Sequence, residues 1–232
     1  PVSATFLGFQ SRDAELGDFT AEAFEERADH ARALLREFKE LPLEGAAVDV
    51  AIDARILSIS LESDLKFHEL TRPHERFPSV YVGTALSGMN QLVLRDFAPL
   101  EERARSLLER IRQTPDVLAC CRRNTKGAPA VFLQIASERA RGGARFLRDV
   151  LPGVGGKVPS LSSDLEAAAA HAAEAFEATA EHLSRLEAEA TSSFAIGREF
   201  FEWLLREVHL LDLDSDGLSE LGRRALRDTE AA

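Results

Sequence analysis

The sequence has 232 residues, of which 45% are apolar, and a formal net charge of −11. This length allows one large domain or two small ones, and the apolar content is sufficient for a buried core. The acidic balance, without any strongly basic stretch, argues against a nucleic-acid surface, which needs clustered Lys and Arg to neutralise phosphates.

Cysteine usage and apolar runs bear on the compartment. The two cysteines, Cys120 and Cys121, are adjacent, and neighbours in a helix point about 100° apart, so they do not bond to each other without strain. Without a disulfide framework we expect a reducing compartment, the cytoplasm. No apolar run reaches about 18 residues, so no membrane-spanning helix is predicted. The sequence starts without Met, and we expect its natural start to lie upstream.

Helical periodicity runs through almost the whole chain. Only AVDVAID (47–53) alternates as a strand would, and it continues into a helical pattern. Thr20 is placed to cap a helix over about 21–41. A second helix is predicted over about 45–70, where Val48, Ile52, Ile56, Ile59 and Leu65 recur at helical spacing.

Prolines and glycines mark the later elements. Pro73 and Pro78 bracket a break before a helix over about 79–96. Pro99, Pro115 and Pro129 each stand where a first-turn proline belongs, so each is predicted to open a separate helix. The last predicted helices are an alanine-rich one over about 160–190, one over about 198–211 that follows Gly197, and one over about 217–230.

These elements predict an all-α protein, an array or bundle of about eight or nine helices with no significant sheet. Residues 1–232 are expected to form a single helical region. The stretch PGVGGKVPS (152–160) is rich in glycine and proline and is interpreted as a linker, which makes it the possible boundary between two parts.

The stretch KFHELTRPHERF (66–77) holds two His-Glu pairs, His68-Glu69 and His74-Glu75. A zinc hydrolase helix needs His at i and i+4, so that one face offers both nitrogens, with Glu as the base. Here the second His lies at i+6, and Pro73 interrupts the helix. We therefore interpret the stretch as a polar corner, with a helix end, a proline break and solvent-facing His-Glu pairs, rather than as a metal site.

The stretch DLDSDG (212–217) resembles a calcium-binding loop. Asp212, Asp214 and Asp216 match loop positions 1, 3 and 5. Position 12 is Arg223, where a bidentate Glu belongs, and a cation there is expected to disable the site. The alternative is a solvated turn in which an Asp or Ser caps the last helix.

Three further patterns indicate structure rather than chemistry. GVGGK (153–157) lacks the first Gly and the Ser or Thr of a phosphate-binding loop. His171 and His182 share a face of the alanine-rich helix but lie about 16 Å apart along its axis, too far for one ion. The cysteine pair favours buried helix positions over reactive ones, and the aromatic residues around Trp203 favour the core.

Three stretches resemble the amino-terminal half of the bacterial domain of unknown function 885 family: SATFLG (3–8), YVGTALSGMNQLVLRDFAPLEERARSLLERI (81–111) and FAIGREFFEWLLREVHL (194–210). Their order and spacing agree with the family, and RDFAPLEERARSLLERI is the most specific part. The likeness extends across nearly the whole chain.

The resemblance implies a mostly helical protein more than twice this long, similar to zinc metallopeptidases. The metal motif expected of the family, His-Glu-x-x-Pro-Gly-His-His, belongs to the carboxy-terminal half, so the resemblance implies that zinc is held by residues beyond this chain. It also implies a fragment, cut at both ends. HELTRPH (68–74) lacks the Gly and the second adjacent His of the motif, so no metal ligand is carried over to this sequence.

Two functions follow from these patterns. The first is the amino-terminal helical half of a metal-dependent, peptidase-like hydrolase, which forms a cleft wall beside a peptide substrate and has the remainder of its own polypeptide as partner. Residues around Tyr81 and Asn90 are the candidates for the cleft side. The second is a non-catalytic helical interaction module. The half-enzyme is expected to expose a large apolar patch, whereas a complete module is expected to be monodisperse.

Overall fold

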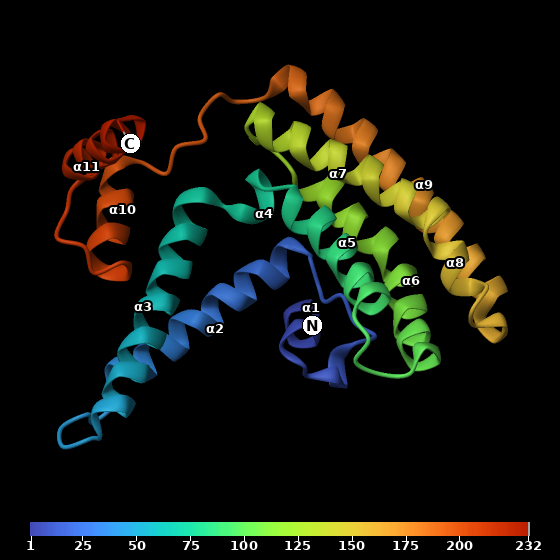
Figure 1. Cartoon of the computed structure of the whole chain (residues 1–232), viewed down its shortest axis with the longest axis horizontal. Helices are drawn as coiled ribbons and strands as arrows, with labels where there is room; N and C mark the ends of the chain where they lie inside the picture. Colours follow the sequence, from blue (N-terminus) through green and yellow to red (C-terminus); the bar gives the residue numbers. More distant parts are fainter. Residues whose placement is uncertain (232) are drawn as a thin grey trace. The chain divides into compact units, whose positions relative to one another are not determined.

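The computed structural model describes residues 1–231 and is built from helices and their connections (Figure 1). Helix accounts for 78% of the chain, and none of residues 1–231 belongs to a strand. The predicted all-α class is confirmed. Two compact units are present and are described separately: unit 1 consists of Pro1–Phe24 and Pro73–Ser193, and unit 2 of Glu25–Arg72 and Phe194–Ala232.

A four-helix bundle forms the body of unit 1. Its helices are α5 (Ser79–Leu94), α6 (Leu100–Asn124), α7 (Ala130–Asp149) and α9 (Ser162–Leu186). They pack in the ring α5–α6–α9–α7, so each contacts two others (Figure 1). Their apolar stripes meet in a single core, which includes Ile111, Leu118, Leu133, Phe176 and Leu183. The shorter elements of the unit are α1 (Val2–Leu7), α4 (Pro73–Arg76), α8 (Leu151–Gly155) and the 3-10 turns Gln10–Arg12, Pro159–Leu161 and Glu187–Glu189.

Small residues let α7 and α9 approach each other closely. A Cβ atom at Gly143 of α7 would lie 2.7 Å from Cε1 of the Phe176 ring in α9. Ala140 and Ala144 of α7 are buried, as are Ala172 and Ala173 of α9. The alanine-rich composition of 160–190 is therefore the composition of a helix packed against a close neighbour.

Helix α6 passes through Pro115 without ending, so the prediction of two separate helices in this region is wrong. Pro115 has no N–H, and an interior proline costs a helix about 3 kcal/mol. Leu107 and Ile111 before the proline and Leu118 and Cys121 after it are at most 1% exposed. Each such buried side chain contributes about 1.5–3 kcal/mol, so one continuous core face outweighs the local defect.

Residues 152–160 fold into the body of unit 1 instead of linking two parts. They form most of α8 and the 3-10 turn Pro159–Leu161. Leu151, Val154, Val158 and Leu161 are each no more than 9% exposed. The division between units falls elsewhere in the chain, because these four apolar side chains hold the stretch against the bundle despite its glycine and proline content.

Buried polar contacts hold the N-terminal segment on the bundle. Arg110 is fully buried and donates to the Thr5 hydroxyl (2.6 Å) and to the carbonyl of Gly88 (2.7 Å). The Thr5 hydroxyl donates in turn to the Asp13 carboxylate (2.6 Å). Burial lowers the pKa of Arg110 from its ordinary value, and the charge of Asp13 opposes that shift. Helix α1 was absent from the sequence prediction because six residues are too few for a periodic pattern.

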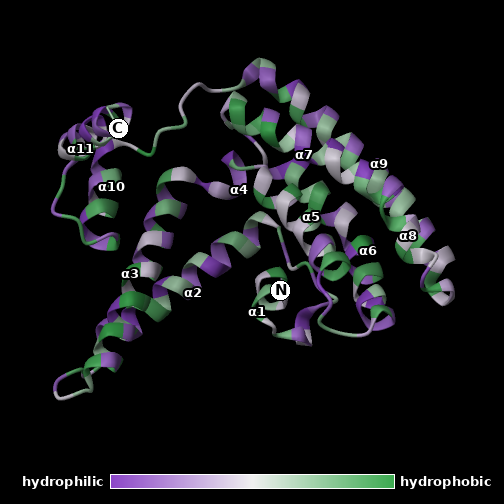
Figure 2. Ribbon diagram, in the orientation of Figure 1, coloured by the Kyte–Doolittle hydropathy of each residue, from purple (hydrophilic) through white to green (hydrophobic). Residues whose placement is uncertain are grey.

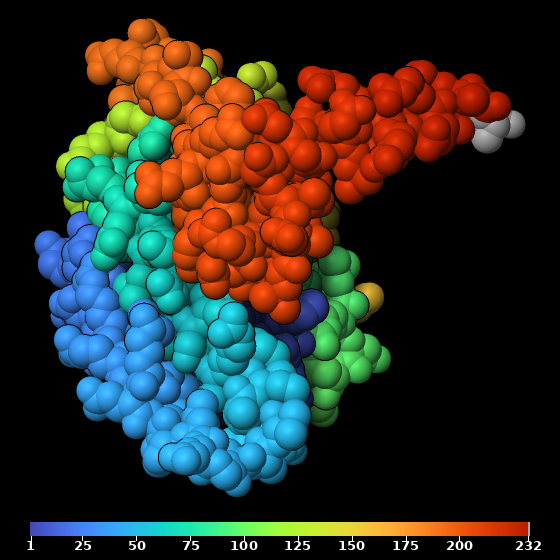
Figure 3. Space-filling view, turned by 90° about the vertical axis from the view of Figure 1, so that its left-hand side faces the viewer, coloured from blue at the N-terminus to red at the C-terminus, as the bar shows by residue number. Residues whose placement is uncertain are grey.

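Unit 2 contains a helix pair and a C-terminal group. α2 (Ala21–Lys39) begins in unit 1 and continues into unit 2, where α3 (Val48–Thr71) follows it. Ion pairs join them in antiparallel register, Lys39 to Glu62 at 3.7 Å and Arg32 to Glu69 at 3.1 Å. The C-terminal group consists of α10 (Arg198–Trp203), a π-helical turn (Leu204–Val208) and α11 (Ser215–Glu230). Helix α11 has no buried residue and projects from α10 (Figure 3).

The apolar residues at helical spacing on α3 are only partly buried. Leu65 is 8% exposed and Ile59 is half-buried, but Val48, Ile52 and Ile56 are 76%, 52% and 55% exposed. These three residues follow one another at four-residue spacing on α3 and are here called the α3 stripe. Figure 2 shows hydrophobic residues, in green, along the ribbon of α3. Helical periodicity identifies an apolar face of this kind but not the element that covers it.

Candidate functional site

A groove of about 510 Å³ opens in unit 2 between the last turns of α3 and residues 196–206. Its volume is within the range of small-ligand pockets, about 300–1,000 Å³. We call it the Trp203 groove. Its apolar lining consists of Leu70, Ile196, Phe200 and Trp203, and its charged lining of Lys66, Glu69, Arg198, Glu199 and Arg206.

Trp203 carries both an aromatic and a cationic contact. The Phe200 ring stacks on it with centroids 5.9 Å apart and planes 19° apart. The ammonium of Lys66 lies 5.1 Å from the centre of the indole ring, where the negative face of the aromatic system attracts a cation. Lys66 forms no ion pair with any carboxylate of residues 1–231. The groove therefore combines an apolar wall with an ammonium that no carboxylate neutralises.

The backbone beside the groove departs from α-helical geometry. Helix α10 passes directly into the π-helical turn Leu204–Val208, and Arg206 of that turn lines the groove. Leu210 then adopts a left-handed conformation with φ +54°. The N–H of Leu211 closes the end by donating to the carbonyl of Leu205 (2.8 Å). Short π-helical turns occur frequently at functional sites, and a left-handed non-glycine residue costs conformational energy.

The sequence did not reveal this groove. Phe200 is buried, as the aromatic pattern predicted, but Trp203 is half-buried and faces the groove. Lys66 and Trp203 belong to segments that are far apart in the chain. Because no motif or spacing connects such residues, only their placement in the fold brings them together.

The predicted helix break within KFHELTRPHERF is confirmed. Helix α3 ends at Thr71, Arg72 is left-handed with φ +46°, and α4 begins at Pro73. In unit 2, Nε2 of His68 lies 3.2 Å from Oε1 of Glu25. His68 thus meets a carboxylate from α2, in an ordinary surface ion pair when its ring is protonated.

The second His-Glu pair lies in unit 1 and is buried, so its predicted exposure to solvent is wrong. His74 is 5% exposed and Glu75 is 7% exposed. The Glu75 carboxylate pairs with the ammonium of Lys126 at 3.0 Å and lies 3.7 Å from Nε2 of His74. The Phe24 ring covers His74 at a centroid distance of 5.3 Å. Burial is possible because Lys126 compensates the carboxylate and aromatic rings cover the imidazole.

Zinc in proteins is held by three or four side chains. Among residues 1–231, neither unit taken alone brings three His, Cys, Asp or Glu donors to one point. The Glu25–His68 pair of unit 2 and the His74–Glu75 pair of unit 1 each supply two donors. Glu75 is in addition engaged by a lysine.

Tyr81, one of the two cleft candidates, is a core residue with a polar tip. It is fully buried, donates to the carbonyl of His74 (2.6 Å) and accepts from the Asn124 amide (3.0 Å). The Phe19 ring packs beside it at 5.8 Å. Asn90, the other candidate, is half-buried on α5. Their role at a cleft stays a prediction.

The DLDSDG stretch begins a helix. α11 starts at Ser215, and the Asp214 carboxylate caps it by accepting from the N–H of Gly217 (2.7 Å). The predicted cap is confirmed. Asp216 pairs with Arg198 at 2.8 Å, and Asp212 is exposed. A calcium loop of this type takes its ligands from a stretch of twelve residues between two helices, whereas a helix here starts at the fourth of these residues. Calcium binding by residues 212–223 stays a prediction.

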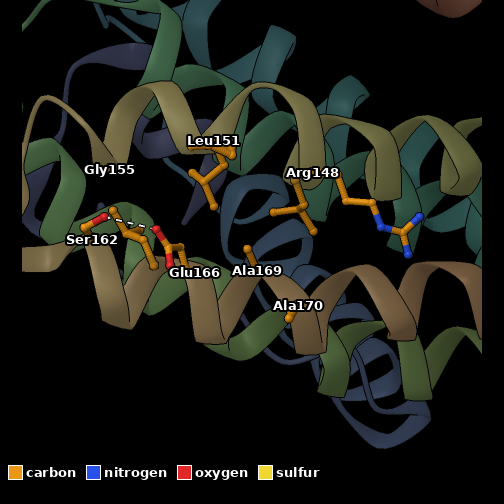
Figure 4. Close-up of a pocket in the computed structure, with 10 residues that line it drawn as sticks. Arg148, Leu151, Gly155, Ser162, Glu166, Ala169 and Ala170 are labelled. Atoms are coloured by element: carbon orange, nitrogen blue, oxygen red, sulfur yellow. Dashed lines mark hydrogen bonds between the residues drawn. The ribbon is translucent and has the colours of Figure 1, made fainter.

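An apolar cavity of about 230 Å³ lies between the end of α7, α8 and the first turns of α9 in unit 1 (Figure 4). Leu151 of α8 and Ala169 of α9 face each other across it. At one end the Ser162 hydroxyl donates to the Glu166 carboxylate (3.2 Å). At the other end Arg148 turns away from the cavity and pairs with a glutamate outside it. The polar groups at its edge are thus already paired. Gly155 of α8 is buried, and a Cβ there would lie 3.2 Å from Oγ of Ser162, so this glycine permits close packing.

Both cysteines are buried on α6, as predicted. Burial raises the pKa of Cys121 to about 12. Burial also raises the pKa of Cys120, and the charge of nearby Arg123 opposes that shift. A thiol that stays protonated at neutral pH is a poor nucleophile, so the pair is structural.

Comparison with known proteins gives a family without an assigned activity. The sequence profile described as "Bacterial protein of unknown function (DUF885)" matches residues 1–232. No curated protein matches the chain. Among solved structures, a "putative lipoprotein of unknown function" from Shewanella oneidensis has a similar fold, with a TM-score of 0.76 at 20% sequence identity.

The structural match covers 100% of this chain and 43% of the Shewanella protein, so the chain spans less than half the length of that neighbour. At this identity the likeness shows the fold alone. No helix within residues 1–231 is both long and apolar enough to cross a membrane. Because the family profile matches over the full length, the chain belongs to the bacterial family of proteins of unknown function DUF885.

Proposed function

We propose that this chain is the amino-terminal helical part of a longer metal-dependent hydrolase of the peptidase type, in which it forms one wall of the substrate cleft. Zinc and the general base belong to the remainder of the polypeptide in this proposal. Support comes from the solved structure that matches all of this chain with less than half of its own length.

The α3 stripe is the observation that carries the proposal. Val48, Ile52 and Ile56 are all more than half exposed on one line of a long helix. Contiguous exposed apolar residues of this kind mark a surface that another element covers. In α11 the apolar residues Leu221 and Leu226 are likewise exposed. Unit 2 thus offers apolar surface for the rest of the polypeptide to pack against.

Within such an enzyme this chain contributes shape and exclusion of water. Residues around Tyr81 and Asn90 are proposed for the cleft side. A zinc ion in the remaining part would polarise the scissile carbonyl and activate a water molecule. The four-helix bundle of unit 1 has its own closed core, so it can hold a wall in place without contributing a ligand.

The reading frame beyond both ends of the chain is the first check, since the proposal requires it to continue into His-Glu-x-x-Pro-Gly-His-His. The full-length protein is then expected to retain one zinc ion and to hydrolyse peptides, whereas this chain alone hydrolyses none.

A stability measurement tests whether the α3 stripe is covered in the full-length protein. Ile52→Asp in the full-length protein is expected to lower its melting temperature by several degrees. Ile135→Asp is the control, because Ile135 is an exposed apolar residue of unit 1. A full-length protein without zinc or peptidase activity would exclude the hydrolase.

A non-catalytic helical interaction module is the second candidate. The closed bundle of unit 1 favours it, because α5, α6, α7 and α9 bury their apolar faces against one another. The exposed faces of α9 are then available for a partner. Light scattering after size exclusion separates the two: the module is expected to be monodisperse, and a half-enzyme with exposed stripes is expected to self-associate in a concentration-dependent way.

We propose the cytoplasm as the compartment, on the support of two free thiols buried in α6. The Shewanella neighbour is described as a lipoprotein, which is the competing assignment. Fractionation of cells that produce the natural full-length protein distinguishes them, because a lipoprotein is recovered with the membrane fraction.

A further inference from the structure

We propose that the Trp203 groove binds an apolar ligand that ends in a carboxylate, such as the carboxyl end of a short apolar peptide. The ligand carboxylate meets Lys66, and its apolar part lies against Trp203, Phe200 and Leu70. This proposal concerns unit 2 alone and does not depend on the proposed hydrolase.

The charges of the groove single out Lys66. Arg198 is paired with Glu202 and Asp216, each at 2.8 Å. Glu69 is paired with Arg32, and Arg206 with its neighbour Glu207. Lys66 is the cation of the groove that has a ring, rather than a carboxylate, as its contact among residues 1–231. An ammonium held against an aromatic face is partly removed from water, so an incoming carboxylate interacts with it more strongly than with a free surface lysine.

The apolar wall of the groove indicates that the part of the ligand beyond its carboxylate is apolar. Leu70 is 55% exposed at the end of α3, and the half-buried Trp203 presents its ring beside it. Phe200 stacks behind Trp203 and is buried. A ligand that covers these surfaces removes apolar area from water, and about 510 Å³ has room for two apolar amino-acid residues.

The irregular backbone is an independent observation that points to the same place. The π-helical turn begins at Leu204, directly after Trp203, and it supplies Arg206 to the groove. The left-handed Leu210 follows within two residues of the turn. Both features cost conformational energy, which a regular continuation of the helix would avoid. They place Trp203 at the end of regular helix, where its ring reaches α3.

Substitution of Glu199 is expected to change the ligand affinity in the opposite direction to substitution of Lys66. It lines the groove, and it forms no ion pair with any residue of 1–231. Its negative charge opposes a carboxylate ligand, so Glu199→Gln is expected to tighten binding, while Lys66→Gln weakens it. A surface that merely adsorbs apolar molecules would respond to neither substitution.

Trp203 is the single tryptophan of the chain, so its fluorescence reports on the groove directly. N-acetyl-leucyl-leucine and its carboxamide are titrated into the protein, with 4-phenylbutyrate as a carboxylate that is not a peptide. The acid is expected to change the emission saturably and to bind roughly tenfold more tightly than the amide, the factor that one charge-assisted contact supplies. Tighter binding of the acetylated peptide than of phenylbutyrate assigns the source of the carboxylate to peptides, and equal binding assigns it to apolar acids in general.

Lys66→Gln is expected to reduce the affinity for the acid to that for the amide. Lys157→Gln, which removes an exposed lysine of unit 1, is expected to leave both affinities unchanged. Circular dichroism establishes that each variant is folded, and calorimetry repeats the titration without the fluorophore. Equal affinities for acid and amide, or a Lys66→Gln variant that binds the acid as the parent does, would overturn the proposal.

Discussion

Two adjacent glycines of α7 have opposite surroundings. A Cβ at Gly143 would lie within 2.7–2.9 Å of three atoms of the buried Phe176 ring, whereas a Cβ at Gly142 meets only Nη2 of Arg145 at 4.0 Å. Gly143→Ala is therefore expected to destabilise the protein by about 1–3 kcal/mol through overpacking. Gly142→Ala is expected to stabilise it by about 0.5–1 kcal/mol because alanine restricts the unfolded chain. Urea unfolding measures both, and equal effects at the two positions would contradict the close approach of α7 and α9.

The thiols give a second prediction for single residues. Burial raises the pKa of Cys121 to about 12, so its thiolate is almost absent at pH 8. We expect native protein at that pH to leave Cys121 unlabelled by iodoacetamide, and denatured protein to be labelled at both cysteines. Peptide mapping identifies the labelled residue. Rapid labelling of Cys121 in the native protein would mean that α6 opens locally.

Single residues were predicted from the sequence only where local chemistry decides their position. Asp214 caps α11 because its side chain needs nothing beyond the next three residues. Tyr81 lies in the core with its hydroxyl donating to the carbonyl of His74, as the size and polarity of a buried tyrosine require. The burial of His74 and Glu75 depends on Lys126 and Phe24. Those partners come from other elements, so the neighbouring sequence could not reveal them.

At the scale of elements, the pattern of residues predicted helices well and their ends less well. The helix over 79–96 and the alanine-rich helix were predicted because their apolar faces are long and regular. Pro115 was interpreted as a helix start, but α6 continues through it, because buried side chains before and after the proline stabilise one continuous helix. The α3 stripe has the same origin: periodicity alone does not distinguish a face that is covered from one that is not.

The cap of α11 gives a prediction at this scale. Because α11 has no buried residue, polar contacts at its start hold it: the Asp214 cap, the ion pair of Asp216 with Arg198, and the Ser215 hydroxyl that donates to Glu202. Asp214→Ala is expected to cost about 0.5–2 kcal/mol of helix stability and to reduce helical circular dichroism and amide protection within α11. Asp212→Ala is the control, since Asp212 is exposed and precedes the cap. Heat released on adding millimolar calcium, and lost in Asp214→Ala, would instead favour the calcium loop.

At the scale of the molecule, composition and periodicity predicted the all-α class, but the division into units lay beyond them. Each unit is assembled from two separate stretches of chain, and α2 crosses the division without any break in its pattern. Long-range contacts decide such a division, and a single sequence does not contain them. The sequence did not predict the Trp203 groove for the same reason, because one wall comes from α3 and the other from residues 196–206.

Zinc content tests the molecule as a whole. This chain, dialysed against buffer with excess zinc and then against buffer alone, is expected to retain no stoichiometric zinc. His68→Ala and His182→Ala are expected to behave as the parent does. One zinc per chain, measured by atomic emission, would contradict the prediction. Loss of that zinc in His68→Ala, but not in His182→Ala, would then assign the ion to a site that includes His68.

The discontinuous units also set an order in which the chain can acquire its structure on the ribosome. The N-terminal segment that Arg110 anchors through Thr5 is translated long before its anchor, which is synthesised only after α5 and the first turns of α6. The α2–α3 pair must likewise wait for α10 until the whole of residues 73–193 has been translated. During that interval residues 25–47 are the part of unit 2 that is available to pack against α3. Unit 2 is therefore expected to complete its packing only after the body of unit 1 has been translated.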